Sequence, residues 1–284
     1  MSSNLQEESE GASTSIGEVV SNTINRVESW VKAHGVGLEM KVAGAFRKKM
    51  PPGYPFSSVD HGRAYIGFDP TSDREKVRET DVVVRLTKST MGNVWITVWL
   101  IIECKSSKAS PWVLYYDLAQ PTGFRYDPFG SLWELKHLDN ITPANIGGFS
   151  SSSFLSGNGI SSCYSLETAT DPDARGNQKN DARDAVRQVI GAAKGITEKA
   201  ALDEHHAQVH VFIPVIITSA PICTITLGMD GEYSVKETKR GLFLGRLDSE
   251  NATPGGVWII SESDLENFAD EAFSAINGLD SRSF

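Results

Sequence analysis

The chain has 284 residues, of which 40% are hydrophobic and 22% charged, the composition of an ordinary globular protein. Its formal net charge of −9 argues against tight nucleic-acid binding through electrostatics alone, because phosphate binding depends largely on Lys and Arg. No apolar run approaches the ~18 residues of a membrane span. The 3 separated cysteines argue against a disulfide framework. We therefore expect a cytoplasmic protein with free thiols and no membrane partner.

The first part of the chain predicts an acidic arm followed by a helix. Residues 1–14 are polar and acidic, which is typical of disorder and unlike a secretory signal. Apolar residues at three- and four-residue spacings then predict an amphipathic helix over 16–33. We expect a strand over 38–43, a loop over 48–55, and a short strand or turn over 65–68.

Two apolar segments predict neighbouring strands at 81–86 and 93–103. The short connection between them contains Gly92, as an antiparallel hairpin would. A stretch rich in Ser and Gly predicts a surface insertion near 140–176. We expect residues 15–284 to form a single domain that carries this insertion.

The later part of the chain continues with helices and strands in alternation. The predicted elements are a helix over 178–201, a buried strand over 209–218, short strands over 222–227, 242–247 and 257–260, and a final helix over 262–276. A helix, three strands, a helix and a further buried strand predict an α/β fold. Its central mixed β-sheet would be flanked by helices on both faces.

Charged residues interrupt the apolar pattern where the second strand ends. Glu103 and Lys105 follow a buried run at alternate positions, so both side chains should lie on one side of the strand. Asp81 opens the neighbouring strand. Because buried strands carry charges only where these are paired or functional, we expect the three side chains to converge. Two carboxylates and a lysine suit a divalent metal and phosphodiester cleavage.

The tripeptide Glu-x-Lys has no specificity by itself, because it occurs four times: at residues 39–41, 103–105, 134–136 and 237–239. Only the copy at 103–105 follows a fully apolar strand and comes after an acidic residue that opens another strand. The other copies are expected to be solvated charge pairs.

Asp81 and Glu103-Cys104-Lys105, in this order of elements, resemble the PD-(D/E)XK nuclease superfamily with its restriction-endonuclease-like fold. The resemblance implies that Asp81 and Glu103 ligate Mg²⁺, with the main-chain carbonyl of Cys104 as a further ligand, and that Mn²⁺ substitutes. Lys105 would orient or deprotonate the attacking water. The side chain of Cys104 should point to the opposite face, into packing.

The extent of the resemblance is limited, since it covers roughly residues 16–218 and one family position differs. Thr80 stands where the family often has a proline before its first Asp.

The resemblance also implies a carboxylate on the first helix and a polar residue on a later one. Glu18 matches the helix position better than Glu28, because it lies about twenty residues before the first predicted strand. Its alternative interpretation is an exposed carboxylate favoured by the helix dipole. On the later helix Gln188 is the candidate, with Lys194 behind it, and solvated helix residues are the alternative for both.

Two functions are compatible with these residues. The first is a Mg²⁺-dependent deoxyribonuclease in prokaryotic antiviral defence or restriction, acting on DNA (or RNA) as a homo-oligomer or after activation by a partner. The second is an inactive member of the same fold that binds nucleic acid or a partner subunit. Local basic clusters could offset the acidic balance, namely Lys41, Arg47, Lys48 and Lys49, then Lys105 and Lys108.

A zinc site is a weaker possibility. His206 and His210 have the four-residue spacing that one face of a helix could use for zinc. The pair straddles a predicted boundary between helix and strand, so we expect two linker histidines and no zinc.

Overall fold

The computed structural model describes residues 16–33, 35–50, 57–69, 74–89, 95–106, 110–117, 148, 152–156, 162–169, 180–200, 208–245 and 255–279. The chain divides into two compact units, Met1–Gly37 and Leu38–Phe284. The predicted arm at 1–14 and most of the predicted insertion at 140–176 lie outside the described residues.

The first unit contains helix α1 (Ile16–Ala33), which confirms the helix predicted over 16–33. Its apolar residues Ile24 and Val27 are more than half exposed to solvent. We describe this unit by itself.

The second unit begins with a helix, α2 (Val36–Lys49), where the sequence predicted a strand, so that prediction is wrong. Leu38, Val42 and Phe46 recur every fourth residue and are buried, which is the spacing of one helical face. Met40 also gave the segment an alternating pattern, but its side chain is exposed. The helical period therefore decides the structure, because it places the buried residues on one side.

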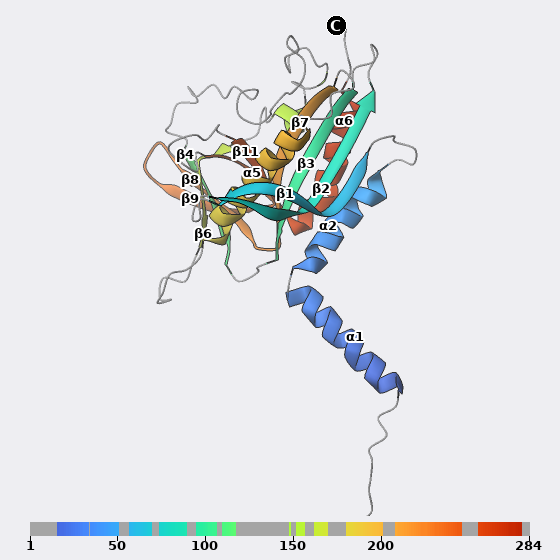
Figure 1. The fold of residues 1–284 in the computed structure, drawn as a ribbon. Coiled ribbons are helices and arrows are strands. Elements are labelled where there is room, and N and C mark those ends of the chain that lie inside the picture. Colours follow the sequence, from blue (N-terminus) through green and yellow to red (C-terminus); the bar gives the residue numbers. More distant parts are fainter. Residues whose placement is uncertain are drawn as a thin grey trace, which may run out of the picture. The chain divides into compact units, whose positions relative to one another are not determined.

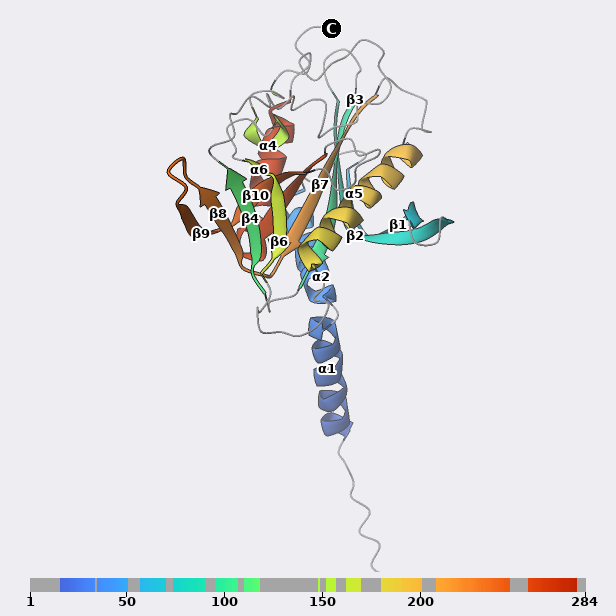
Figure 2. The same cartoon turned by 90° about the vertical axis from the view of Figure 1, so that its left-hand side faces the viewer.

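Among the described residues, strands form a larger sheet of seven, in the order β1-β2-β3-β7-β11-β10-β5, and a smaller sheet of four, in the order β6-β4-β8-β9 (Figures 1 and 2). The strands are β1 (Ser58–Asp69), β2 (Arg74–Ser89), β3 (Trp95–Lys105), β4 (Trp112–Asp117), β5 (Ser162–Cys163), β6 (Ser165–Thr168), β7 (Gln208–Thr218), β8 (Ile222–Leu227), β9 (Tyr233–Thr238), β10 (Arg240–Gly245) and β11 (Gly255–Ser261). The further helices of the second unit are α4 (Ser153–Ser156), α5 (Asp181–Ala200), the 3₁₀ turn η2 (Glu262–Asp264) and α6 (Leu265–Asn277).

The larger sheet is mixed. Strands β1, β2 and β3 form an antiparallel meander, and the Ser89–Trp95 pair lies at the end of the predicted hairpin. Strand β7 runs parallel to both β3 and β11, so the buried strand predicted over 209–218 is central. The short strand or turn expected over 65–68 belongs to the longer β1.

Two clusters of buried side chains form the core and share the central strands. Val98, Leu100 and Ile102 of β3 belong to a cluster that includes residues of α2, α4 and α6. Trp99 and Ile101 belong to a second cluster that includes residues of α5. The alternation follows from strand geometry, which directs successive side chains to opposite sides. The result is a mixed α/β structure around a mixed sheet.

The predicted C-terminal elements occur in their predicted order with small shifts of boundary, but the sequence analysis predicted no strand where β9 (Tyr233–Thr238) lies. The final helix α6 begins after η2, and the hydroxyl of Ser261 accepts a hydrogen bond from the Ser263 N–H at the start of this turn. Within the part of the chain that the structure describes, no helix combines the length and apolar character needed to cross a membrane.

Candidate active site

Asp81 lies beside β3 at the point where the pairing of β2 with β3 ends. The final partners along this ladder are Val82 and Ile102. Beyond them, the backbone N–H of Cys104 donates a hydrogen bond to Asp81 Oδ2, with an N···O distance of 2.6 Å. A carboxylate therefore satisfies this amide at the end of the ladder, and the contact joins the two strands predicted to carry the site.

Lys105 connects the end of β3 with helix α5. Its Nζ donates hydrogen bonds to Glu103 Oε1 at 2.8 Å and to Gln188 Oε1 at 2.7 Å. The first contact confirms that Glu103 and Lys105 lie on the same side of the strand. The second brings in Gln188, the residue expected on the later helix. Four of the predicted residues, Asp81 included, are thus gathered where β2, β3 and α5 meet.

Burial shapes the electrostatics of the two carboxyl groups. The pKa of Asp81 is raised from its ordinary value of 3.8 to about 7, chiefly by removal from water and then by the negative charge of Glu103. The pKa of Glu103 is also raised, again chiefly by burial, although the Lys105 ammonium acts in the opposite direction. Both groups therefore resist ionisation when no additional positive charge is near.

A third carboxylate near the site was not foreseen. The charge of Glu39, in the first turn of α2, raises the pKa of both Asp81 and Glu103. Its Oε2 also lies 2.9 Å from Nε2 of His61 on β1. The sequence analysis missed Glu39 because it assigned this segment to a strand. The helical spacing of Leu38, Val42 and Phe46 was the signal that could have found it.

The helix carboxylate that the sequence favoured, Glu18, lies on α1 in the first unit. Its side chain is outside the described residues, so its role stays a prediction. Glu28, the less favoured candidate, is exposed on the same helix. Lys194, the residue behind Gln188, is exposed on α5.

Cys104 serves packing rather than chemistry. Its side chain packs against the core cluster that includes α2 and α6, which confirms the predicted orientation. Burial and the neighbouring carboxylates raise the thiol pKa far above its usual range, so a nucleophilic thiolate is not favoured.

The histidine pair does not form a helical face. His210 is buried in β7, and its Nδ1 accepts a hydrogen bond from Trp99 Nε1 at 3.0 Å. His206 lies outside the described residues.

The basic residues of α2 are partly neutralised by acidic residues from η2 and α6. Lys41 Nζ lies 2.7 Å from Glu262 Oε1, and Lys49 Nζ lies 2.5 Å from Asp270 Oδ1. The pKa of Lys49 is raised by its hydrogen bond to Asp270. These two lysines are therefore less available to a phosphate than the sequence suggested.

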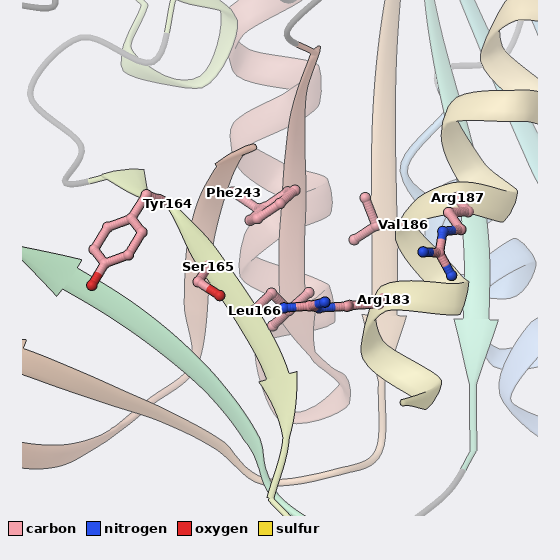
Figure 3. Close-up of a pocket in the computed structure, with 7 residues that line it drawn as sticks. All are labelled: Tyr164, Ser165, Leu166, Arg183, Val186, Arg187 and Phe243. Carbon is pink, nitrogen blue, oxygen red and sulfur yellow. The ribbon is translucent and has the colours of Figure 1, made fainter. Parts of the chain in front are cut away.

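A cavity of about 130 Å³ lies beside the N-terminal half of α5 (Figure 3). Arg183 and Arg187 of α5 line it together with the aromatic rings of Tyr164 and Phe243. Arg187 directly precedes Gln188 along the helix. One helix thus carries both a residue of the carboxylate site and two guanidinium groups at a neighbouring cavity, a connection that the sequence analysis did not identify.

The donor set at the strand ends fits a hard divalent cation. Asp81, Glu103 and Glu39 are three carboxylates near one ammonium, that of Lys105, and the raised pKa values reflect this excess of negative charge. Within the described ranges, no three His, Cys, Asp or Glu side chains form a ready group of ligands. An ion here would therefore combine two carboxylates with a carbonyl and with waters, which Mg²⁺ readily retains.

Comparison with known proteins gives no match to a family model, to a curated protein or to a solved structure.

Proposed function

We propose that the chain is a Mg²⁺-dependent deoxyribonuclease with a restriction-endonuclease-like core, and that it acts in prokaryotic defence. The observation that carries the proposal is the convergence of Asp81, Glu103, Lys105 and Gln188 at the ends of two paired strands. The sequence predicted that Asp81, Glu103 and Lys105 converge, and these contacts support that prediction.

The arrangement of elements supports the same fold family. Helix α2 precedes the antiparallel meander β1-β2-β3, and β7 follows α5 to lie parallel to β3. Residues of α2 and α6 belong to one core cluster, and residues of α5 belong to the other. This supports the expectation that helices flank both faces of the sheet. Each of these features supports the fold that the resemblance of Asp81 and Glu103-x-Lys105 implies.

In this proposal each side chain has a distinct task. Asp81 and Glu103 hold the metal, with the carbonyl of Cys104 as a further ligand. Lys105 uses two of its three donors on Glu103 and Gln188, which fixes the ammonium in place. The remaining donor can orient the attacking water and stabilise charge on a phosphate oxygen. Gln188 is thus a positioning residue that acts through Lys105.

A bound Mg²⁺ or Mn²⁺ supplies a more acidic water and offsets the phosphate charge. In the hydrolysis, the water oxygen forms a new bond to phosphorus while a bridging P–O bond breaks. The water proton passes to solvent or to a nearby base, and the leaving oxygen takes up a proton.

The cavity on α5 offers further contacts to a nucleic-acid backbone. Guanidinium groups bind phosphates well, and the exposed ring of Tyr164 can stack on a base. Arg183 is paired with Glu167 and Arg187 with Asp184. A bound phosphate would therefore replace these carboxylates as the partner of the two arginines. DNA is the proposed substrate because the resemblance to the nuclease superfamily implies it, and RNA is tested alongside it.

The direct test is cleavage of supercoiled plasmid with Mg²⁺ or Mn²⁺. We expect the intact protein to nick or linearise the plasmid, and Glu103→Ala and Lys105→Ala to reduce the rate at least about a hundredfold, as loss of a metal ligand or of transition-state stabilisation does. A labelled single-stranded RNA is included as a second substrate. Circular dichroism verifies that each variant is folded.

The chain provides a matched control in another Glu-x-Lys tripeptide. Glu237 and Lys239 have the same spacing but are exposed around the end of β9, so Glu237→Ala and Lys239→Ala should leave cleavage unchanged. Equal activity in the variants at 103 and 105 would remove the site assignment. A folded protein that cleaves neither DNA nor RNA would favour the inactive, binding member of the fold.

A further inference from the structure

An exposed apolar patch covers the hairpin formed by β8 and β9. Tyr233 is 71% exposed, Val235 56% and the turn residue Met229 88%. The pairs Leu227–Tyr233 and Ile225–Val235 place these residues on one face of the hairpin, because cross-strand partners share a face. Exposed apolar patches of this kind are typical of interaction surfaces.

Among the described strands, β9 is also the outer edge of the smaller sheet (Figure 2). The N–H of Gly228 donates to the carbonyl of Glu232 at 2.7 Å, so Glu232 faces β8. Backbone groups alternate in direction along an antiparallel strand, so Ser234 also faces β8 whereas Tyr233 and Val235 direct their N–H and C=O groups to the open edge. An edge with available backbone groups and apolar side chains is a template for another strand.

We propose that β9 is a homodimer interface, at which two copies of the chain pair their β9 strands antiparallel around a two-fold axis. In the register with Ser234 opposite Ser234 of the other copy, Tyr233 lies opposite Val235 and Glu232 lies opposite Lys236. About four backbone hydrogen bonds then join the outward-facing groups of Tyr233 and Val235 in the two copies. The two smaller sheets become one continuous sheet with one apolar face.

Charge complementarity favours this register, and it favours a second copy of the chain as the partner. A shift that places Lys236 opposite its own copy is disfavoured by repulsion, whereas the proposed register pairs it with Glu232. Within the described residues, neither Lys236 nor Glu232 forms an ion pair inside its own chain. The strand is thus complementary to itself, both in its apolar pair and in its charges, as a two-fold interface requires.

The interface is small, so the dimer should depend on concentration. A strand of 6 residues buries less than the ~1,200 Å² of a typical stable interface. We expect sedimentation equilibrium of the full chain to show a monomer–dimer transition in the range of about 1–100 μM. This inference is independent of the proposed nuclease function.

Charge reversal tests the register. Glu232→Lys and Lys236→Glu should each raise the dimer dissociation constant about tenfold, because each places like charges opposite one another twice in the dimer. The double variant should recover the original dissociation constant. Glu237→Lys makes the same charge change as Glu232→Lys on the same strand, but it faces Gly231 and should have little effect.

Cysteine cross-linking gives a second readout. Ser234 lies at a non-hydrogen-bonded position of the proposed pair, where Cα atoms are about 4.5 Å apart, within the span of a disulfide. Under mild oxidation, Ser234→Cys should form a covalent dimer faster than the unmodified chain. Val235→Cys should not, because the two Cα atoms would be more than ~7 Å apart. A chain that stays monomeric up to the highest concentration overturns the proposal. The proposal is also overturned if a dimer forms whose dissociation constant does not respond to charge reversal. The same holds if the two cysteine variants cross-link equally.

Discussion

At the residue scale, the candidate site is a balance between burial and charge. Asp81 and Glu103 are removed from water and near one another. Lys105 donates a hydrogen bond to Glu103, and the Cys104 N–H donates one to Asp81. Such arrangements are unfavourable for a fold and are typical of sites that bind cations or transfer protons. Glu39 adds to the negative charge, so the site is better suited to a divalent cation than the sequence alone indicated.

The raised pKa of Asp81 makes stability depend on pH. Because its folded value of about 7 exceeds the ordinary 3.8, the folded chain binds more protons than the unfolded chain between these values. Stability should therefore fall as the pH rises through this window. Asp81→Asn removes the penalty of the buried charge. We expect it to stabilise the metal-free protein at pH 8 by on the order of 1–3 kcal/mol, since one pKa unit is ~1.4 kcal/mol.

Urea denaturation with a chelator at pH 5 and pH 8 measures this effect. Asp230→Asn, on the exposed turn after β8, serves as the control and should leave the pH dependence unchanged. A variant at Asp81 whose stability falls with pH as steeply as that of the unmodified chain would contradict the assignment.

At the element scale, one residue of the β1–β2 pair next to the site has a left-handed backbone conformation. Gly62 lies between the paired residues His61 and Arg63, on the strand next to Asp81, and has a φ of 68°. This is the left-handed region, which glycine occupies without strain. A Cβ at Gly62 would also overlap with Glu79 Oε1. The hairpin therefore needs glycine at this position, because the backbone has a positive φ and because there is no room for a Cβ.

Gly62→Ala should destabilise the protein by about 1–3 kcal/mol, because alanine is strained at positive φ even after Glu79 moves away. Gly191→Ala in α5 is the matched control. Nothing lies within 4 Å of its Cβ, and the helix interior favours alanine by roughly 0.5–1 kcal/mol. Chemical denaturation should show that the free energy of unfolding falls in Gly62→Ala and rises in Gly191→Ala. If the destabilisation disappears in a Glu79→Ala background, its cause is the contact between the new Cβ and Glu79 and not backbone strain.

At the scale of the whole molecule, the meander, α5 and β7 bring distant segments to one place. Lys105 and Gln188 are far apart in the chain, yet the parallel pairing of β3 with β7 positions α5 so that they form a hydrogen bond. A metal at this junction would connect these segments and should stabilise the entire fold, since a ligand that binds only the folded state raises its stability.

We expect Mg²⁺ or Mn²⁺ to raise the melting temperature, with a gain of about 2.7 kcal/mol when free metal is about 100 times the dissociation constant. The gain should be larger at pH 8 than at pH 6, because protons compete for the carboxylates. Differential scanning fluorimetry measures it without any cleavage assay. Glu103→Gln should abolish the shift and Glu237→Gln should retain it. An equal shift in both variants would place the metal elsewhere.

The sequence by itself determined the strands at the centre of the sheet, the helices α1, α5 and α6, and the side that Glu103 shares with Lys105. These follow from local periodicity, since a strand alternates its side chains and a helix repeats every 3.6 residues. Only the tertiary structure decided that Glu39 of α2 lies near the two carboxyl groups, and that Lys105 contacts Gln188. It also decided that lysines of α2 are partnered by η2 and α6. These depend on contacts between segments far apart in the chain, where burial and pairing override a local pattern.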